Sequence, residues 1–287
     1  MAAGEYDETE RLRRTTFGGS ADIYSNGRPG YPAAVFAHLA DRCGLGPGTS
    51  VLEIGPGAGQ ATGPLLDSGA TVLAVELGKE FEPLLRAKFE GKALGVVVGE
   101  FESVPLPTRT FDLVAAGTSF HWMPPEVALA RVAEILKPDG WLALWWTHYG
   151  DPDRPDPFRE ALQPVFHRHV PDFTDEVSSG VAIGADPYVF DRAARSREVA
   201  RSGLFGPLEQ ALFAWEATLS SQDVRRFFAS FSKWILLDER VRESLLDEIE
   251  QLVTNEFSGT VQRPYVTAVY STQLVPVKRT KWSGTRR

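Results

Sequence analysis

A glycine-rich loop at residues 55–60 has the residue types needed to hold a ligand against the backbone. It reads GPGAGQ and directly follows the apolar run VLEI at residues 51–54. Glycine permits a tight turn and a close approach of the backbone, and the first N–H groups of a following helix are available to a ligand. A dinucleotide site needs the pattern G-x-G-x-x-G to seat a pyrophosphate. Here the third glycine comes one residue early, at Gly59, and Gln60 stands where that pattern needs glycine, which disfavours a dinucleotide.

Carboxylates accompany three successive apolar runs. Glu53 lies two residues before the loop, where its charge would repel a pyrophosphate and favour a ligand with a positive charge, such as an ammonium or a sulfonium. A structural role for Glu53, holding the N–H groups of the loop, remains open. Glu76 ends the second run, a position suited to hydrogen bonding with a ribose diol. Glu100 and Glu102 flank Phe101 after the third run, where a carboxylate can accept a hydrogen bond from an adenine amino group and the phenyl ring can pack nearby.

The elements that must position these residues alternate between strand and helix. Apolar runs predict strands at residues 51–54, 71–75, 94–98, 111–116 and 141–146, and helical spacing predicts helices at residues 60–67, 79–89 and 124–136. Nearly continuous apolar strands between helices are typical of a parallel sheet covered on both faces. We therefore expect a doubly wound α/β domain with its ligand site at the carboxyl ends of the strands.

The second half changes character after a loop rich in proline and aspartate at residues 150–157. Helices are expected at residues 158–169, 191–202, 224–235 and 241–253, and strands at residues 208–219 and 265–275. Ser220 and Asp223 have the spacing of a capping box. The two late strands could join the sheet as an antiparallel hairpin at one edge, with the helices between them as a cap over the ligand end.

Composition excludes several classes of protein. The 287 residues include 30 Lys and Arg and 38 Asp and Glu, a net charge of −8, which argues against binding nucleic acid over the whole surface. The single cysteine, Cys43, excludes an internal disulfide and a cysteine-based zinc site and fits a cytoplasmic location. Acidic residues occupy the N-terminus where a signal peptide would be apolar, and the longest apolar run, residues 141–146, is too short to cross a bilayer. We expect a cytoplasmic protein that does not enter a membrane.

These motifs resemble those of the class I S-adenosylmethionine-dependent methyltransferases. The resemblance covers roughly residues 17–147 and is carried, in order, by VLEIGPGAGQ, Glu76, GEFESVP, FDLVAAGTSFHWM and RVAEILKPDGWLAL. The stretch from Tyr24 to Pro32 and the triplet FHW look like a subgroup of small-molecule methyltransferases related to the trans-aconitate enzymes. The implied fold is a seven-stranded Rossmann-like sheet with a helical cap inserted in the second half. The implied reaction moves a methyl group from S-adenosylmethionine to an oxygen, nitrogen or carbon atom of a small-molecule acceptor.

The expected organisation follows from this resemblance and from the pattern of elements. It comprises a flexible N-terminus at residues 1–16, a cofactor-binding core at 17–149, a helical substrate cap at 150–207, the last strands with amphipathic cap helices at 208–277, and a basic disordered tail at 278–287.

The resemblance also implies which residues contact the cofactor. The glycines of the loop would line its methionine part, Glu76 would bind its ribose, and Glu100 and Phe101 its adenine. Family members more often have a small residue at the position of Phe101, so this side chain could narrow the adenine pocket. The predicted cofactor residues are Glu53, Gly55, Pro56, Gly57, Gly59, Gln60, Glu76, Leu77, Glu100, Phe101, Glu102, Gly117 and Thr118.

The acceptor side is expected around His121, which follows the fourth strand. His121 could act as a general base, orient the acceptor, or bond to the backbone and shape the pocket. No base is obligatory, because transfer from a sulfonium can proceed by proximity and orientation. Trp122 could stack on a ligand or belong to the core, and the stretch before the first strand could form a lid or a packed turn. The predicted substrate and lid residues are Tyr24, Arg28, Tyr31, His121, Trp122 and Trp146.

Two other functions remain open from the sequence. One is a cofactor-binding protein of the same fold that transfers no methyl group, either a scaffold or a non-transferring S-adenosylmethionine-dependent enzyme. The other is an RNA methyltransferase aided by the basic tail. Nucleic acid is disfavoured because AGTSFHW at residues 116–122 lacks the Asn-Pro-Pro-aromatic element of enzymes that methylate flipped bases.

No metal site is predicted, since His167 and His169 lack completing ligands and the aspartates at 151–156 lack the glycine of a calcium loop. A monomer or a homodimer is expected.

Overall fold

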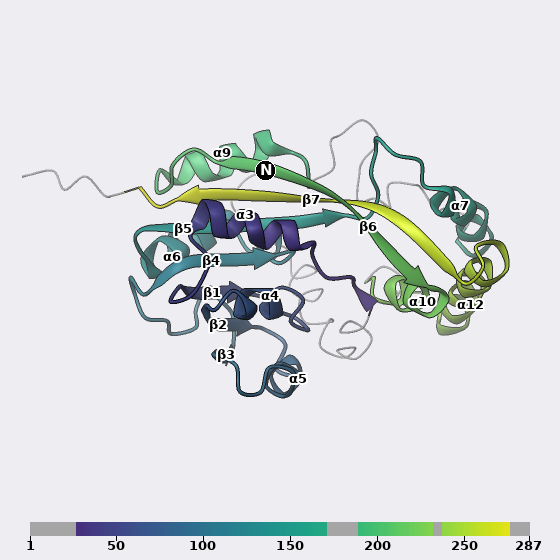
Figure 1. Cartoon of the computed structure of the whole chain (residues 1–287), viewed down its shortest axis with the longest axis horizontal. Helices are drawn as coiled ribbons and strands as arrows, with labels where there is room; N and C mark the ends of the chain where they lie inside the picture. The colour runs from purple at the N-terminus through teal and green to yellow at the C-terminus, as the bar shows by residue number, and fades with distance from the viewer. Residues whose placement is uncertain (1–26, 171–188, 232–236, 276–287) are drawn as a thin grey trace, which may run out of the picture.

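The computed structural model describes residues 27–170, 189–231 and 237–275. In these residues, seven strands form one mixed sheet in the order β3-β2-β1-β4-β5-β7-β6 (Figure 1). The first five strands are parallel, and β7 pairs antiparallel with both β5 and β6. This arrangement confirms the predicted doubly wound Rossmann-like sheet with its late antiparallel strands at one edge. The strands are β1 Ser50–Ile54, β2 Thr71–Glu76, β3 Leu94–Val98, β4 Phe111–Gly117, β5 Leu136–His148, β6 Glu209–Ser220 and β7 Thr260–Gln273.

Helices cover both faces of the sheet because successive strand residues point to opposite sides. Val51 of β1 packs in one core with α3 and α4, whereas its neighbour Leu52 packs in another core with α6. The helices are α3 Ala33–Cys43, α4 Thr62–Asp67, α5 Phe81–Lys88, α6 Pro125–Ile135, α7 Pro157–His169, α9 Arg192–Ser202, α10 Ser221–Ala229 and α12 Glu239–Glu256, with a short 3₁₀ turn, η2, at Phe120–Trp122.

Helix α3 is missing from the elements expected above. Its buried side chains, Val35, Phe36, Leu39 and Cys43, recur at helical spacing and pack on the sheet. The sequence therefore contained the signal for this helix, which lies between the lid stretch and the first strand.

The helices α7, α10 and α12 form a separate core at the end of the sheet toward which β4 and β5 point (Figure 1). The predicted capping box begins α10, where Ser220 accepts a hydrogen bond from the backbone N–H of Asp223 and the Asp223 carboxylate accepts one from the N–H of Ser220. The twelve-residue β6 and fourteen-residue β7 extend into this core with Leu219 and Tyr265. The three helices thus lie at the end of the sheet where a ligand site is expected.

Residues 150–207, expected as one helical cap, divide between two places in the structure. Helix α7 joins α10 and α12, but α9 packs on α6, and its Val199 shares a core with Leu129 and Tyr270. Helix α9 therefore belongs to the layer that covers the sheet. The physical reason is packing, because Val199, the buried side chain of α9, lies in the core formed with α6 and the sheet and not in the core of α7, α10 and α12. The segment 1–16, Tyr24 and the tail 278–287 lie outside the described residues.

Candidate functional site

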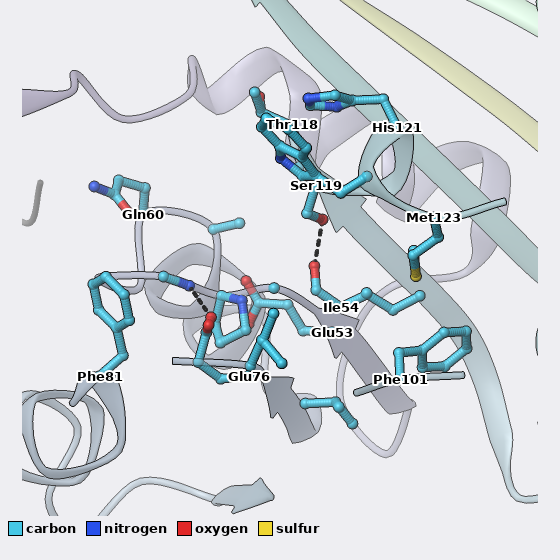
Figure 2. Close-up of a pocket in the computed structure, with 18 of the residues that line it drawn as sticks. Glu53, Ile54, Gln60, Glu76, Phe81, Phe101, Thr118, Ser119, His121 and Met123 are labelled. Atoms are coloured by element: carbon cyan, nitrogen blue, oxygen red, sulfur yellow. Dashed lines mark hydrogen bonds between the residues drawn. The ribbon is translucent and has the colours of Figure 1, made fainter. Parts of the chain in front are cut away.

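A cavity of about 250 Å³ lies at the carboxyl ends of β1, β2 and β4. Its walls come from the glycine loop, the end of β2, residues 99–101, the end of β4 with η2, and the chain before α3 (Figure 2). The structure brings most of the predicted residues to this one place, as the topology requires when parallel strands end at a common edge. The predicted residues that line the cavity are Arg28, Tyr31, Glu53, Gly55, Pro56, Gly57, Gln60, Glu76, Leu77, Glu100, Phe101, Gly117, Thr118, His121 and Trp122.

The glycine loop is held across three strand ends. The backbone N–H of Gly55 donates to the carbonyl of Val75 at 2.9 Å, and the Ser119 hydroxyl donates to the carbonyl of Ile54 at 2.5 Å (Figure 2). Gly55 has φ +65°, and a Cβ there would lie 2.7 Å from Cβ of Ser119. Only glycine therefore fits this position without strain or displacement of Ser119.

Gly59 has a different role from the one predicted. With φ +82°, it faces α5, and a Cβ would lie 2.6 Å from the ring of Phe89 and 3.1 Å from Leu85. Gly59 does not line the cavity among the described residues. Gly59 is required for close packing of the loop against α5. The sequence motif does not distinguish a glycine that packs on a helix from one that lines the cavity.

Glu76 links the end of β2 to the glycine loop. One carboxylate oxygen accepts a hydrogen bond from the backbone N–H of Gly57 at 2.9 Å (Figure 2), and the other accepts one from Gly78 at 2.8 Å. Burial raises the pKa of Glu76, and these backbone N–H groups oppose that rise. Because a carboxylate oxygen has two lone pairs, each oxygen can accept a further hydrogen bond from a ligand hydroxyl.

Glu53 is 1% exposed and lies behind the loop, where it lines the cavity. Its carboxylate accepts a hydrogen bond from the Thr62 hydroxyl at 2.7 Å, so it ties β1 to α4. Burial raises the pKa of Glu53 to about 7, and the nearby charge of Glu76 acts in the same direction. A positive charge in the cavity would favour the ionised form of this carboxyl group.

Residues after β3 form the wall expected for adenine. Gly99 donates its N–H to the carbonyl of Glu76 at 2.9 Å, which holds the two strand ends together. Phe101 is 3% exposed and both lines the cavity and packs in the main core. Glu100 lines the cavity, whereas Glu102, which was also predicted, lies in the turn that follows and is not among the lining residues.

His121 and Trp146 meet on the acceptor side. The indole N–H of Trp146 donates to Nδ1 of His121 at 3.0 Å, and Trp146 is 3% exposed in the core behind the histidine. Trp146 therefore supports the cavity wall instead of forming it, in contrast to its predicted substrate contact. Burial lowers the pKa of His121 to about 4, and the cations Arg28 and Arg195 act in the same direction. His121 is neutral at pH 7 in this environment.

The chain before α3 contacts the far side of the cavity. Arg28 donates to the Tyr149 hydroxyl at 3.4 Å, and its guanidinium lies 4.9 Å from the ring centre of Phe231. The hydroxyl groups of Tyr31 and Thr118 are hydrogen bonded at 3.1 Å. Thr118 has φ +59°, an uncommon conformation for a β-branched residue and typical of functional sites.

Several lining residues were missed by the sequence reasoning. Ser119 and Met123 lie within the motif FDLVAAGTSFHWM, and Tyr149 directly follows β5, so the strand-end rule could have found all three. Phe81 begins α5 on the side of the cavity opposite Phe101 in Figure 2, and no local pattern marks it.

Within residues 27–170, 189–231 and 237–275, no group of three or more His, Cys, Asp or Glu side chains could hold a metal ion. Over the same ranges, no helix combines the length and the apolar character needed to span a membrane.

Comparison with known proteins finds similarity to methyltransferases. Residues 52–144 match the family model described as a methyltransferase domain. An uncharacterized methyltransferase of Schizosaccharomyces pombe is 27% identical over 259 residues, which cover 88% of this chain and 95% of the relative. The YcgJ protein of Bacillus subtilis has the same fold, with a TM-score of 0.52, 16% identity and coverage of 85% of this chain and 100% of that chain.

A second similar structure is phosphoethanolamine N-methyltransferase 2 of Haemonchus contortus, in complex with phosphomonomethylethanolamine and S-adenosylhomocysteine. It has a TM-score of 0.52 and 14% identity, and the match covers 92% of this chain and 59% of that chain. The family model, the relative and the shared fold agree with the glycine loop and strand-end carboxylates described above. Residues 52–144 of this chain therefore match a methyltransferase domain, and the similarity to the methyltransferase of Schizosaccharomyces pombe extends over 88% of the chain.

Proposed function

We propose that this protein binds S-adenosylmethionine in the cavity and transfers its methyl group to a small-molecule acceptor. The observation that carries the proposal is the position of Glu53, Glu76 and Glu100, which come from three successive strands and line one cavity around the glycine loop. Carboxylates at these points suit a cationic ligand with a ribose and an adenine, and they disfavour a pyrophosphate. The Haemonchus enzyme of the same fold in complex with S-adenosylhomocysteine also supports this choice.

The donor and acceptor groups of the cavity fit this cofactor. Glu76, held by the N–H groups of Gly57 and Gly78, retains lone pairs for the ribose hydroxyls. Gly55 leaves no space for a side chain and allows the methionine part to approach the backbone. Phe101 and Glu100 lie where the adenine would be held.

S-Adenosylmethionine, when bound, supplies an electrophilic methyl group on a sulfonium. The residues of this chain would bind both reactants, align the acceptor with the methyl group and exclude water. His121, Trp122 and Tyr149 line the part of the cavity left for the acceptor. A small molecule is favoured as acceptor because the chain carries a net charge of −8 and lacks the element of base-flipping enzymes noted above.

Isothermal titration with S-adenosylmethionine and S-adenosylhomocysteine tests the binding step. The Glu76→Gln variant should bind at least about tenfold more weakly, because it loses the charged acceptor for the ribose. The matched control is Glu82→Gln on α5, where the carboxylate is exposed and pairs with Arg86 at 2.9 Å. Failure of the folded wild-type protein to bind either ligand would refute the proposal.

Methyl transfer requires a separate assay. Labelled S-adenosylmethionine and a small-molecule extract should give a labelled product, which mass spectrometry can identify. Binding without transfer to any acceptor would instead support a cofactor-binding protein of the same fold. Labelling confined to an RNA fraction, and sensitive to salt, would identify an RNA methyltransferase.

A further inference from the structure

The pairing of Trp146 with His121 restricts what the histidine can do. Trp146 lies on β5 and His121 on η2, 25 positions apart, and the bond between indole Nε1 and imidazole Nδ1 measures 3.0 Å. Trp122 packs against the same imidazole with ring centres 4.7 Å apart. The histidine ring is therefore fixed from two directions at the wall of the cavity.

The direction of this hydrogen bond determines the position of the histidine proton. An indole N–H can only donate, so Nδ1 of His121 must offer its lone pair. In a neutral imidazole the proton then resides on Nε2, which makes that nitrogen a donor. Because the two ring nitrogens point in nearly opposite directions, the Nε2–H is directed away from Trp146.

We propose that Trp146 is a positioning residue that holds His121 as the Nε2–H tautomer, so that Nε2 of His121 is a donor and His121 does not serve as a general base. The inference rests on the proposed function and specifies one property of the acceptor. An acceptor atom that contacts Nε2 of His121 must present a lone pair to it. Its reacting lone pair forms the new bond to the methyl carbon, the carbon–sulfur bond breaks with its electrons on sulfur, and any proton leaves to water.

The surroundings of the imidazole favour the neutral form. Among the described residues, the cations that act electrostatically on His121 are Arg28, before α3, and Arg195, on α9, and Arg195 forms an ion pair with Glu198 at 2.8 Å. Burial and these cations lower the pKa of His121 to about 4. The neutral form is required for the described hydrogen bond, because a protonated imidazole would present an N–H to the indole N–H.

Side-chain nitrogen NMR of the full-length protein, with ¹⁵N-labelled histidine, tests the proposal without an activity assay. We expect the His121 signals of wild-type protein to show protonation at Nε2 alone at neutral pH. The Trp146→Phe variant removes the N–H and keeps an aromatic ring, and its His121 should populate both tautomers. Protonation of wild-type His121 at Nδ1, or an unchanged Nε2–H tautomer in Trp146→Phe, would overturn the proposal.

Trp145→Phe is the matched control for that measurement. Trp145 is the adjacent residue on the opposite face of β5, fully buried, with an indole nitrogen that makes no hydrogen bond in the structure. The control therefore removes the same indole group without touching His121 Nδ1. It should retain the wild-type His121 signals, whereas a change equal to that of Trp146→Phe would assign the effect to packing and overturn the proposal.

Kinetics with an identified acceptor give the second test. His121→Gln keeps an N–H donor and should remain within roughly tenfold of wild-type kcat, whereas a lost general base would lower kcat by about 10² to 10⁴. A loss of that larger size in His121→Gln, with no comparable loss in Trp146→Phe, would overturn the donor role. If the NMR result is as expected and no methyl transfer is found, the proposed function fails while the assignment of the tautomer stands.

Discussion

Arg263 and Asp156 form a buried ion pair, with guanidinium Nε donating to the carboxylate at 2.7 Å and side-chain exposures of 4% and 6%. The pair joins β7 to the N-terminus of α7, where the other oxygen of Asp156 accepts the N–H of Arg159 at 3.1 Å. A second nitrogen of Arg263 donates to the carbonyl of Tyr149 at 3.2 Å. One arginine thus connects the helical cluster to a residue that lines the cavity.

Asp156→Asn should lower the free energy of unfolding by about 3–5 kcal/mol, because it leaves the Arg263 charge buried without its partner. Denaturant unfolding followed by circular dichroism measures this change. The exposed Asp153→Asn is the control and should unfold like wild type. An effect of Asp156→Asn below about 0.5 kcal/mol would show that the pair is not a structural link.

Gly55→Ala should weaken both folding and cofactor binding. The left-handed backbone costs a non-glycine residue about 1–2 kcal/mol, and the added Cβ also collides with Ser119 at 2.7 Å. Gly91→Ala separates these two effects, because Gly91 has φ +75° and open space around it. We expect thermal unfolding to show similar backbone strain in both variants, and titration to show lost binding only in Gly55→Ala. Equal binding by the two variants would contradict the assigned role of Gly55.

The affinity for S-adenosylmethionine should increase as pH rises from about 5.5 to about 7.5. Burial raises the pKa of Glu53 to about 7, so below that pH most of the unliganded protein has Glu53 protonated. Binding of a cationic ligand beside the ionised carboxylate then requires that Glu53 lose its proton. Calorimetry in buffers of different ionisation enthalpy measures the released proton. S-Adenosylhomocysteine, which lacks the sulfonium charge, and the Glu53→Gln variant are the controls, and both should show a weaker pH dependence. A flat profile for the wild type would be inconsistent with Glu53 as the counterion.

The same carboxyl group makes folding of the unliganded protein depend on pH with the opposite sign. Because the folded-state pKa of about 7 lies above the ordinary value of 4.5, protonated Glu53 stabilises the folded state. This contribution is fully present below about pH 4.5 and is lost as pH rises through about 7. Glu53→Gln should therefore reduce the loss of stability between those pH values, as measured by denaturant unfolding at each pH.

Ser220→Ala should destabilise the protein by about 1 kcal/mol, since it removes half of the capping box that begins α10. The Ser220 hydroxyl accepts the N–H of Asp223 at 3.1 Å. Ser221→Ala, one residue into the helix, provides the comparison and should change the free energy of unfolding by less. Both changes in the free energy of unfolding follow from the denaturant midpoints, provided that the variants unfold with the same dependence on denaturant concentration.

Much of the sheet was predictable because parallel strands buried on both faces are apolar runs. The predicted strand at residues 94–98 has the bounds of β3, and β1, β2 and β4 differ from prediction by one residue at one end. β5 begins at Leu136, earlier than the expected strand at residues 141–146, because residues 137–140 form an irregular extension of the strand between two pairings with β4. The carboxylates Glu53, Glu76 and Glu100 were predictable for the same reason, since parallel strands end at a common edge.

The chain alone determined the α/β class, the strand-end position of the cavity and most of the residues that line it, because those depend on local periodicity and strand direction. It could not determine which glycine meets the cavity and which meets a helix, as Gly55 and Gly59 show. Nor could alternation along β5 reveal which face of the strand carries the indole that bonds to His121. These choices depend on contacts between residues far apart in the chain, and only packing of the folded elements decides them.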